Sequence, residues 1–189
     1  MLAKLSTLTT SIKYGPHLTT ARNGQVRYLK AQHFDLHNQL TEVDDSYADP
    51  TAELDPLLLK EGQLILAGKG NRHFAWAYRL EAGPCIASSL FYVMKVRTKM
   101  IDPRFLALLL NASTCGRALS AIAKGATVPV IPKRELMDLS FPVPTKEQQQ
   151  QAIRLYELQT QRRQLTRELS ALTDILDQAY LERLLQPNQ

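Results

Sequence analysis

Residues 145–185 read TKEQQQQAIRLYELQTQRRQLTRELSALTDILDQAYLERLL and contain neither Gly nor Pro. Thr145 and Gln148 have the spacing of a capping box, which predicts that a helix begins there. Apolar residues then recur every three or four positions, at Leu155, Leu158, Leu165, Leu169, Leu172, Leu176 and Ala179. Arg162 and Arg183 occupy two further positions of the same series. This spacing is typical of the seam of a coiled coil or a long helical hairpin. About 40 helical residues extend ~60 Å, more than the width of a small domain, so we expect the helix to pair with a second helix. The alternative is a terminal helix packed on its own domain.

The charges are distributed unevenly along the chain. The 189 residues carry a net charge of +5, yet residues 145–189 contain six basic and six acidic residues, so the whole excess lies in residues 1–144. Residues 31–55 contain seven acidic residues and no Lys or Arg, whereas residues 60–134 contain twelve basic and three acidic residues. A basic body of this kind is compatible with a polyanionic partner. The alternative is a solvated surface whose charge keeps the protein soluble.

Residues 1–144 show the patterns of short strands and short helices. We expect strands at residues 26–29, 64–66, 74–78 and 86–96, and the alternation of Phe74, Trp76 and Tyr78 gives the third of these one aromatic face. Helices are expected at residues 103–110 and 114–124 and again after Ile131-Pro132. Asp102 would cap the first of these helices ahead of Pro103. Residues 38–56 contain two Asp-Pro pairs and are expected to form a mobile surface loop. We therefore predict an α+β fold, with a mixed small sheet and short helices over residues 1–144 and a long coiled-coil helix over residues 145–189.

The sequence lacks the motifs of common catalytic and cofactor sites. Gly68-Lys69-Gly70 has neither the spacing nor the following Ser or Thr of a phosphate-binding loop, and no dinucleotide-binding glycine motif occurs. Cys85 and Cys115 have no His at an informative spacing. His33 and His37 flank Asp35, but a polar turn is the better interpretation than a metal site. We expect no catalytic residue, no metal and no cofactor.

No apolar run approaches the roughly 18 residues that a membrane span needs, and the N-terminus lacks the pattern of a secretory signal. A cytoplasmic location is therefore expected, with no membrane partner.

Two loops have the residue types that bind DNA. Arg and Asn read base edges with paired hydrogen bonds, while Lys and exposed backbone amides contact phosphates. The loop at Gly70 and the loop at Gly125 supply such residues, and the candidate DNA-binding residues are Lys69, Asn71, Arg72, His73, Lys124, Thr127 and Lys133. Gln32-His33 offers a third polar loop. For each loop taken alone, a solvated turn is at least as good an interpretation.

Four motifs in order resemble the specificity (S) subunits of type I restriction-modification enzymes. Residues 60–68, KEGQLILAG, resemble the family's strand and turn L-x-x-G-D-I-L-x-x-x-x-G, with Gln63 where Asp is usual. Residues 102–106 resemble a helix start of the family, and residues 125–139 resemble its "G-t-t…i…l…l" pattern. Residues 141–153, from Phe141-Pro142-Val143-Pro144 to Ile153, resemble the segment that opens the family's spacer helix.

The resemblance implies a half-length S subunit, with a target-recognition domain over residues 1–144 and a spacer and dimerisation helix over residues 145–189. Such subunits bind double-stranded DNA without catalysis and carry modification (methyltransferase) and restriction subunits. A usual member has two recognition domains separated by two antiparallel helices. Two copies of this chain would restore that geometry as a homodimer paired through antiparallel C-terminal helices, with Leu155, Leu158, Leu165, Leu169, Leu172 and Leu176 in the contact. The alternatives are a degenerate truncated subunit and a protein-interaction adaptor without specific DNA binding.

Overall fold

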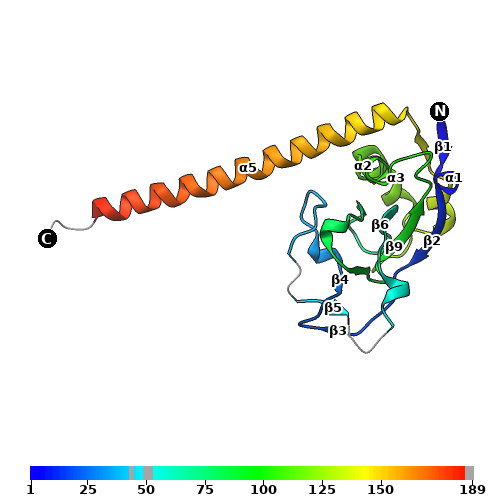
Figure 1. Ribbon diagram of the computed structural model, residues 1–189, viewed down its shortest axis with the longest axis horizontal. Helices are drawn as coiled ribbons and strands as arrows, with labels where there is room; N and C mark the ends of the chain where they lie inside the picture. Colours follow the sequence, from blue (N-terminus) through cyan, green and yellow to red (C-terminus); the bar gives the residue numbers. More distant parts are fainter. Residues whose placement is uncertain (43–44, 49–52, 186–189) are drawn as a thin grey trace. The chain divides into compact units, whose positions relative to one another are not determined.

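The computed structural model describes residues 1–42, 45–48 and 53–185 (Figure 1). It divides into two compact units, Met1–Gln149 and Gln150–Gln189.

The centre of the first unit is an antiparallel four-stranded sheet. Its strand order is β2 (Thr9–Tyr14), β9 (Phe91–Val96), β6 (Gln63–Ala67) and β7 (Ala75–Ala77). Side chains alternate between the two faces of such a sheet, so Ile65 lies beside its cross-strand partner Val93, while Leu64 lies beside Met94 on the other face. Both faces are buried, which explains why β6 reads as a continuous apolar run.

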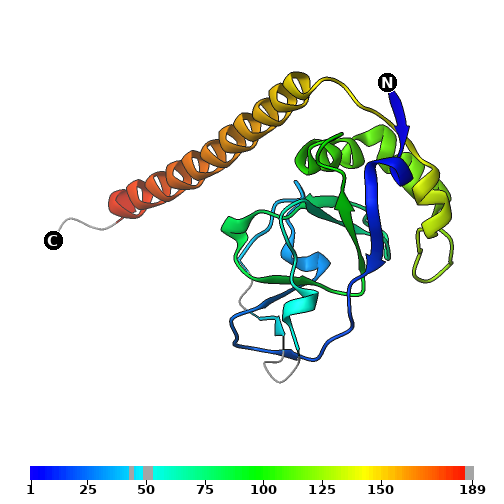
Figure 2. The same ribbon diagram turned by 45° about the vertical axis from the view of Figure 1, so that its right-hand side comes forward.

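The second sheet has the order β3 (Thr20–Ala21), β5 (Tyr47–Ala48), β4 (Arg27–Leu29) and β8 (Cys85–Ala87), and only β4 and β8 run parallel. A two-stranded ladder joins β1 (Leu2–Lys4) to β10 (Ser140–Pro142). The helices of this unit are α1 (Leu5–Leu8), α2 (Pro103–Asn111), α3 (Ser113–Ile122) and α4 (Lys133–Asp138), with 3-10 turns at Ala31–His33, Asp55–Leu57 and Leu80–Ala82. Figures 1 and 2 show α2 and α3 on one side of the central sheet and the second sheet on the other.

An aromatic cluster fills the space between the two sheets. Phe74 lies 5.0 Å from Phe34 and 5.8 Å from Phe91 between ring centroids, and all three rings are buried. Trp76 and Tyr78 pack against the same cluster. The predicted aromatic face of residues 74–78 is therefore confirmed, because alternate residues of an extended chain point the same way.

Two of the predictions for this unit were wrong. Residues 86–96 do not form one strand: β8 ends at Ala87, and β9 begins at Phe91 in the other sheet, so the apolar run crosses from one sheet to the other. Residues 38–56 are not wholly a surface loop, since Ser46 and Ala48 are buried and β5 joins the second sheet. The remainder of that prediction, at residues 43–44 and 49–52, lies outside the described residues.

The free edge of β7 is covered by a side chain of α2. The Asn111 amide accepts a hydrogen bond from the Ala75 N–H and donates one to the Ala75 carbonyl, both at 2.8 Å. Asn111 is the last residue of α2, whose Asp102 cap is confirmed by a 2.8 Å bond from the Arg104 N–H. A side-chain amide thus satisfies the peptide groups that an edge strand leaves open.

The helix α5 (Lys146–Leu185) begins where the capping box predicted. The Thr145 N–H donates to the Gln148 amide oxygen (3.1 Å), and the Gln148 N–H donates to the Thr145 hydroxyl (3.3 Å). The next residue, Gln149, is fully buried within the first unit and bonds only to backbone: its amide accepts from the Asp102 N–H (2.8 Å) and donates to the carbonyls of Met100 (3.2 Å) and Pro144 (3.0 Å).

The predicted seam residues of α5 are exposed in the single chain, at 55–69% of their full area: Leu155, Leu158, Leu165, Leu169, Leu172 and Leu176. Among the described residues no single helix is long and apolar enough to cross a membrane, although α2 and α3 together, bent by 73°, meet the criterion of length and composition.

Candidate nucleic-acid interface

The turn between β6 and β7, residues 68–73, is joined through its backbone to the loop between α3 and α4. Ile131 N–H donates to the Gly68 carbonyl and Gly70 N–H donates to the Pro129 carbonyl, both at 2.8 Å. Both loops were predicted to bind DNA, although they are about 55 residues apart in the sequence. The structure therefore places them side by side.

The loop between α3 and α4 closes on itself before it meets that turn. Lys124 and Val130 exchange two backbone hydrogen bonds, at 2.9 and 2.8 Å. Gly125 follows with φ +115°, a conformation that favours glycine, and an added Cβ would lie 2.9 Å from the Val128 carbonyl oxygen. Residues 125–128 are exposed, so the Thr127 hydroxyl and the neighbouring peptide groups face solvent.

Lys69 is stabilised by an aromatic stack. Its ammonium nitrogen lies 4.4 Å from the centroid of the Tyr14 ring, and Tyr14 stacks on Tyr92 with the ring centroids 4.1 Å apart. Tyr92 is buried and donates its hydroxyl hydrogen to the Ile131 carbonyl at 2.7 Å; burial, and next the Tyr14 hydroxyl, raise its pKa. A cation–π contact leaves the N–H groups of the lysine able to bind a phosphate. Lys69 is thus a partly buried cation with a defined position.

Most of the Arg72 hydrogen-bond donors are used within the protein. Its guanidinium donates to the carbonyls of Phe34 (2.9 Å) and Asp35 and to the side-chain oxygen of Asn38 (2.7 Å), and it lies over the Phe74 ring. Three of the five N–H groups are therefore used inside the protein. This side chain ties the β6–β7 turn to residues 34–38.

The remaining predicted DNA-binding residues differ in what they contact. His73 bonds to the Ala67 carbonyl through Nδ1 (3.0 Å), and the Lys133 ammonium donates to the Ile12 carbonyl (3.1 Å). Lys124 forms a 2.6 Å ion pair with Glu135, whose pKa is lowered first by the hydrogen bond from that lysine. Asn71 is exposed on the β6–β7 turn. Lys69, Asn71, Lys124 and Thr127 are therefore together at the two joined loops, while His73 and Lys133 bond to the body of the fold.

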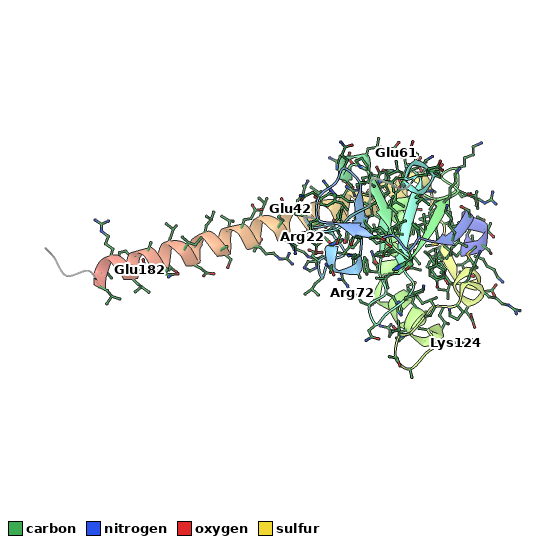
Figure 3. The ribbon with its side chains drawn as sticks, turned by 90° about the horizontal axis from the view of Figure 1, so that it is seen from below. Arg22, Glu42, Glu61, Arg72, Lys124 and Glu182 are labelled. Atoms are coloured by element: carbon green, nitrogen blue, oxygen red, sulfur yellow. The ribbon has the colours of Figure 1, made fainter. Side chains whose placement is uncertain are left out.

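The end of β6 that lies away from the β6–β7 turn differs from that turn in charge. Glu61, Glu81 and Asp102 line a groove there together with Arg79 and Arg104, so acidic residues outnumber basic ones by one. Figure 3 shows Arg72 and Lys124 toward one side of the first unit and Glu61 toward the other. The cationic loops thus lie at one end of the central sheet.

The residues considered for metal or thiol chemistry include His33, Cys85 and Cys115. Both ring nitrogens of buried His33 are engaged, Nδ1 by the Lys30 N–H and Nε2 by the Asp45 carboxylate, each at 3.0 Å. Within residues 1–42, 45–48 and 53–185, no group of three or more His, Cys, Asp or Glu side chains is placed to hold a metal. Burial raises the pKa of Cys85 and Cys115 to about 11, so both remain thiols at neutral pH.

One part of the interface was missed by sequence reasoning. Residues 34–40 form a closed turn that Arg72 contacts, and the sequence signal for it was Asp35 followed three residues later by the turn-forming Asn38. In the structure Asn38 has φ +62°. The predicted polar loop at Gln32-His33 is the 3-10 turn that leads into it.

Three solved structures match this chain over nearly all of its length. They are the S subunit of a type I restriction-modification system from M. genitalium (TM-score 0.65, 15% identity), the HsdS subunit from Thermoanaerobacter tengcongensis (0.66, 16%), and a chain from a study of complex assembly and conformational transition of the type I R-M system (0.66, 16%). The matches cover 97%, 100% and 100% of this chain but 45%, 50% and 50% of those chains, so it spans about half their length. No family model and no curated protein sequence matches it. Over nearly its whole length, the chain therefore has the fold of about half of a type I restriction-modification S subunit.

Proposed function

We propose that this protein binds double-stranded DNA sequence-specifically, without catalysis, as the specificity component of a type I restriction-modification complex. The observation that carries the proposal is that the fold shared with S subunits places two cationic loops, distant in sequence, together at one end of the central sheet. In this proposal residues 1–144 form the target-recognition domain, and modification and restriction subunits assemble on the same protein in the cytoplasm.

The chemistry of the joined loops supports this function. Lys69 and Lys124 supply positive charge for phosphates, and the exposed Asn71 and Thr127 supply donors and acceptors for base edges or backbone. The Lys69 and Lys124 side chains have defined partners within the protein, which reduces the entropy lost when DNA is bound.

We further propose that residues 145–189 mediate homodimerisation, with the helices antiparallel. The seam leucines are more than half exposed, which leaves a long apolar stripe for a partner helix. The charge of the helix supports the antiparallel direction. Residues 150–167 contain four Arg and one Glu, while residues 168–185 contain four acidic residues and one Arg. Antiparallel pairing sets each basic half against an acidic half, whereas parallel pairing sets like charges side by side.

Selection of duplexes from a random pool tests the proposed function. We expect an enriched inverted repeat, because a twofold dimer presents two identical reading surfaces. The selected duplex should bind at least a hundredfold more tightly than a scrambled one, and affinity for both should fall with salt. Mass measurement of the free protein should give twice 21.3 kDa.

The exposed seam also favours a second candidate, a protein-interaction adaptor whose basic body only keeps it soluble. An adaptor would enrich no duplex sequence and would show the same weak, salt-sensitive binding to every duplex. The enrichment step therefore separates the two functions.

A further inference from the structure

Residues 34–40, which we name the knuckle, form a closed turn with its own hydrogen-bond network. Phe34 and Leu40 pair across its base. One oxygen of the Asp35 carboxylate accepts from the N–H groups of His37 and Gln39, both at 2.8 Å. The Asp35 N–H donates to the Gln39 carbonyl at 3.0 Å, and the Asn38 N–H donates to the Asp35 carbonyl at 3.0 Å. Hydrogen bonds among four residues thus close a compact turn from within.

The knuckle is also held firmly to the body of the fold. Arg72 donates to Phe34, Asp35 and Asn38, so one guanidinium binds both arms of the turn. The Phe34 ring is 3% exposed and lies among the aromatic rings between the two sheets. The base of the knuckle is therefore part of the core, and its tip has little freedom to move.

Leu36 occupies the tip. It is 88% exposed, and no other large apolar side chain among the described residues is exposed to a greater extent. A single exposed leucine is ordinary on a protein surface. Leu36 differs because its backbone is fixed by the two arms of the turn, and because the arginine that fixes them belongs to the β6–β7 turn of the candidate interface. An apolar group held rigidly beside a DNA-binding turn is suited to contact the apolar part of a base.

We propose that Leu36 is a base-contacting residue that recognises the C5-methyl group of a thymine in the major groove, and that Arg72 is the residue that positions it. This inference rests on the proposed function. Thymine is the base that presents an apolar group in the major groove, and that groove, about 12 Å wide, admits a protein element as broad as a helix. Three of the five N–H groups of Arg72 donate to the knuckle. Arg72 therefore affects specificity by holding Leu36 in position.

The experiment removes the methyl group from the DNA and the side chain from the protein separately. Each thymine of the selected duplex is replaced in turn by uracil, which lacks only the C5-methyl group. For the wild-type chain we expect one position in each half-site where the replacement weakens binding about three- to fivefold, the effect of burying one methyl group. Leu36→Ala should bind the thymine and uracil duplexes equally at that position and keep its affinity for the scrambled duplex.

Two further variants test whether the effect is particular to Leu36 and whether Arg72 acts by positioning it. Leu80→Ala truncates another exposed leucine (62%) in the 3-10 turn Leu80–Ala82, and it should keep the uracil profile of the wild type. Arg72→Lys keeps the charge but loses the geometry that binds three acceptors at once. We expect it to lose the uracil sensitivity while the salt dependence of binding stays unchanged. If Arg72 only contacted a phosphate, Arg72→Lys would keep both the uracil sensitivity and the salt dependence, and the positioning role would be wrong.

The outcomes distinguish this inference from the proposed function. If a specific duplex is selected and Leu36→Ala keeps the same uracil profile, Leu36 does not read thymine and the inference is wrong. If Leu36→Ala weakens every duplex equally, Leu36 makes a general contact and the inference is also wrong. If the wild-type chain selects no sequence, the proposed function itself fails.

Discussion

Gln149 gives the sharpest test of how the structure is held together. It is one of four consecutive glutamines, residues 148–151, yet it alone among them is buried, and its side chain makes three hydrogen bonds to backbone groups. Gln149→Met keeps the length and helix propensity of the side chain but removes all three bonds. Each bond contributes roughly 0.5–1.5 kcal/mol net, so the free energy of unfolding should fall by about 2–4 kcal/mol.

That loss corresponds to a fall in melting temperature of roughly 5–15 °C for a chain of this size. Trp76 is the only tryptophan, it packs against the aromatic cluster, and its fluorescence therefore reports unfolding of the first unit without interference from α5. Urea titrations should be compared with Gln151→Met, where the same change is made at an exposed position of the same glutamine run. The control should lie within about 0.5 kcal/mol of wild type. Equal unfolding midpoints for the two variants would refute the role assigned to the buried amide.

Three further predictions concern the sheet edge, the interface and the helix. Asn111→Leu leaves one buried N–H and one carbonyl of the β7 edge without partners, and urea titration should show a loss of about 2–3 kcal/mol. Glu135→Gln releases Lys124 from its ion pair, so the plot of log K against log salt should steepen by ~0.9 per chain, and an unchanged slope would argue against a phosphate contact by that lysine. Leu172→Asp should convert the proposed dimer to a monomer in sedimentation, whereas Leu181→Asp, placed on the other side of the helix, should leave it a dimer; dissociation by both would show that the seam is not the contact.

The elements that local sequence predicts are those whose signals lie within a few residues. The Thr145–Gln148 capping box, the absence of Gly and Pro and the 3–4 spacing of leucines predicted α5 almost to the residue, because capping and helix propagation are interactions between near neighbours. The Asp102 cap of α2 and the aromatic face of residues 74–78 were confirmed for the same reason. The DNA-binding and dimerisation residues stay predictions.

Other features depend on partners far away in the sequence. Phe91 begins a strand in a different sheet from Ala87, and an apolar run carries no mark of which sheet its residues will join. Gln149 and its three glutamine neighbours are chemically identical, so only the packing of residues 100–102 against the start of α5 decides which of them is buried.

The contacts of Arg72 at the candidate interface also depend on residues far away in the sequence. From sequence alone, an arginine in a Gly-bounded basic turn indicates a DNA contact, since residue type and local charge are all that can be read. The acceptors that take up its guanidinium lie 34–38 residues earlier in the chain. Hydrogen-bond donors are satisfied by whichever acceptors the fold brings near them, so the sequence determined the kind of group present and the tertiary structure decided what that group binds.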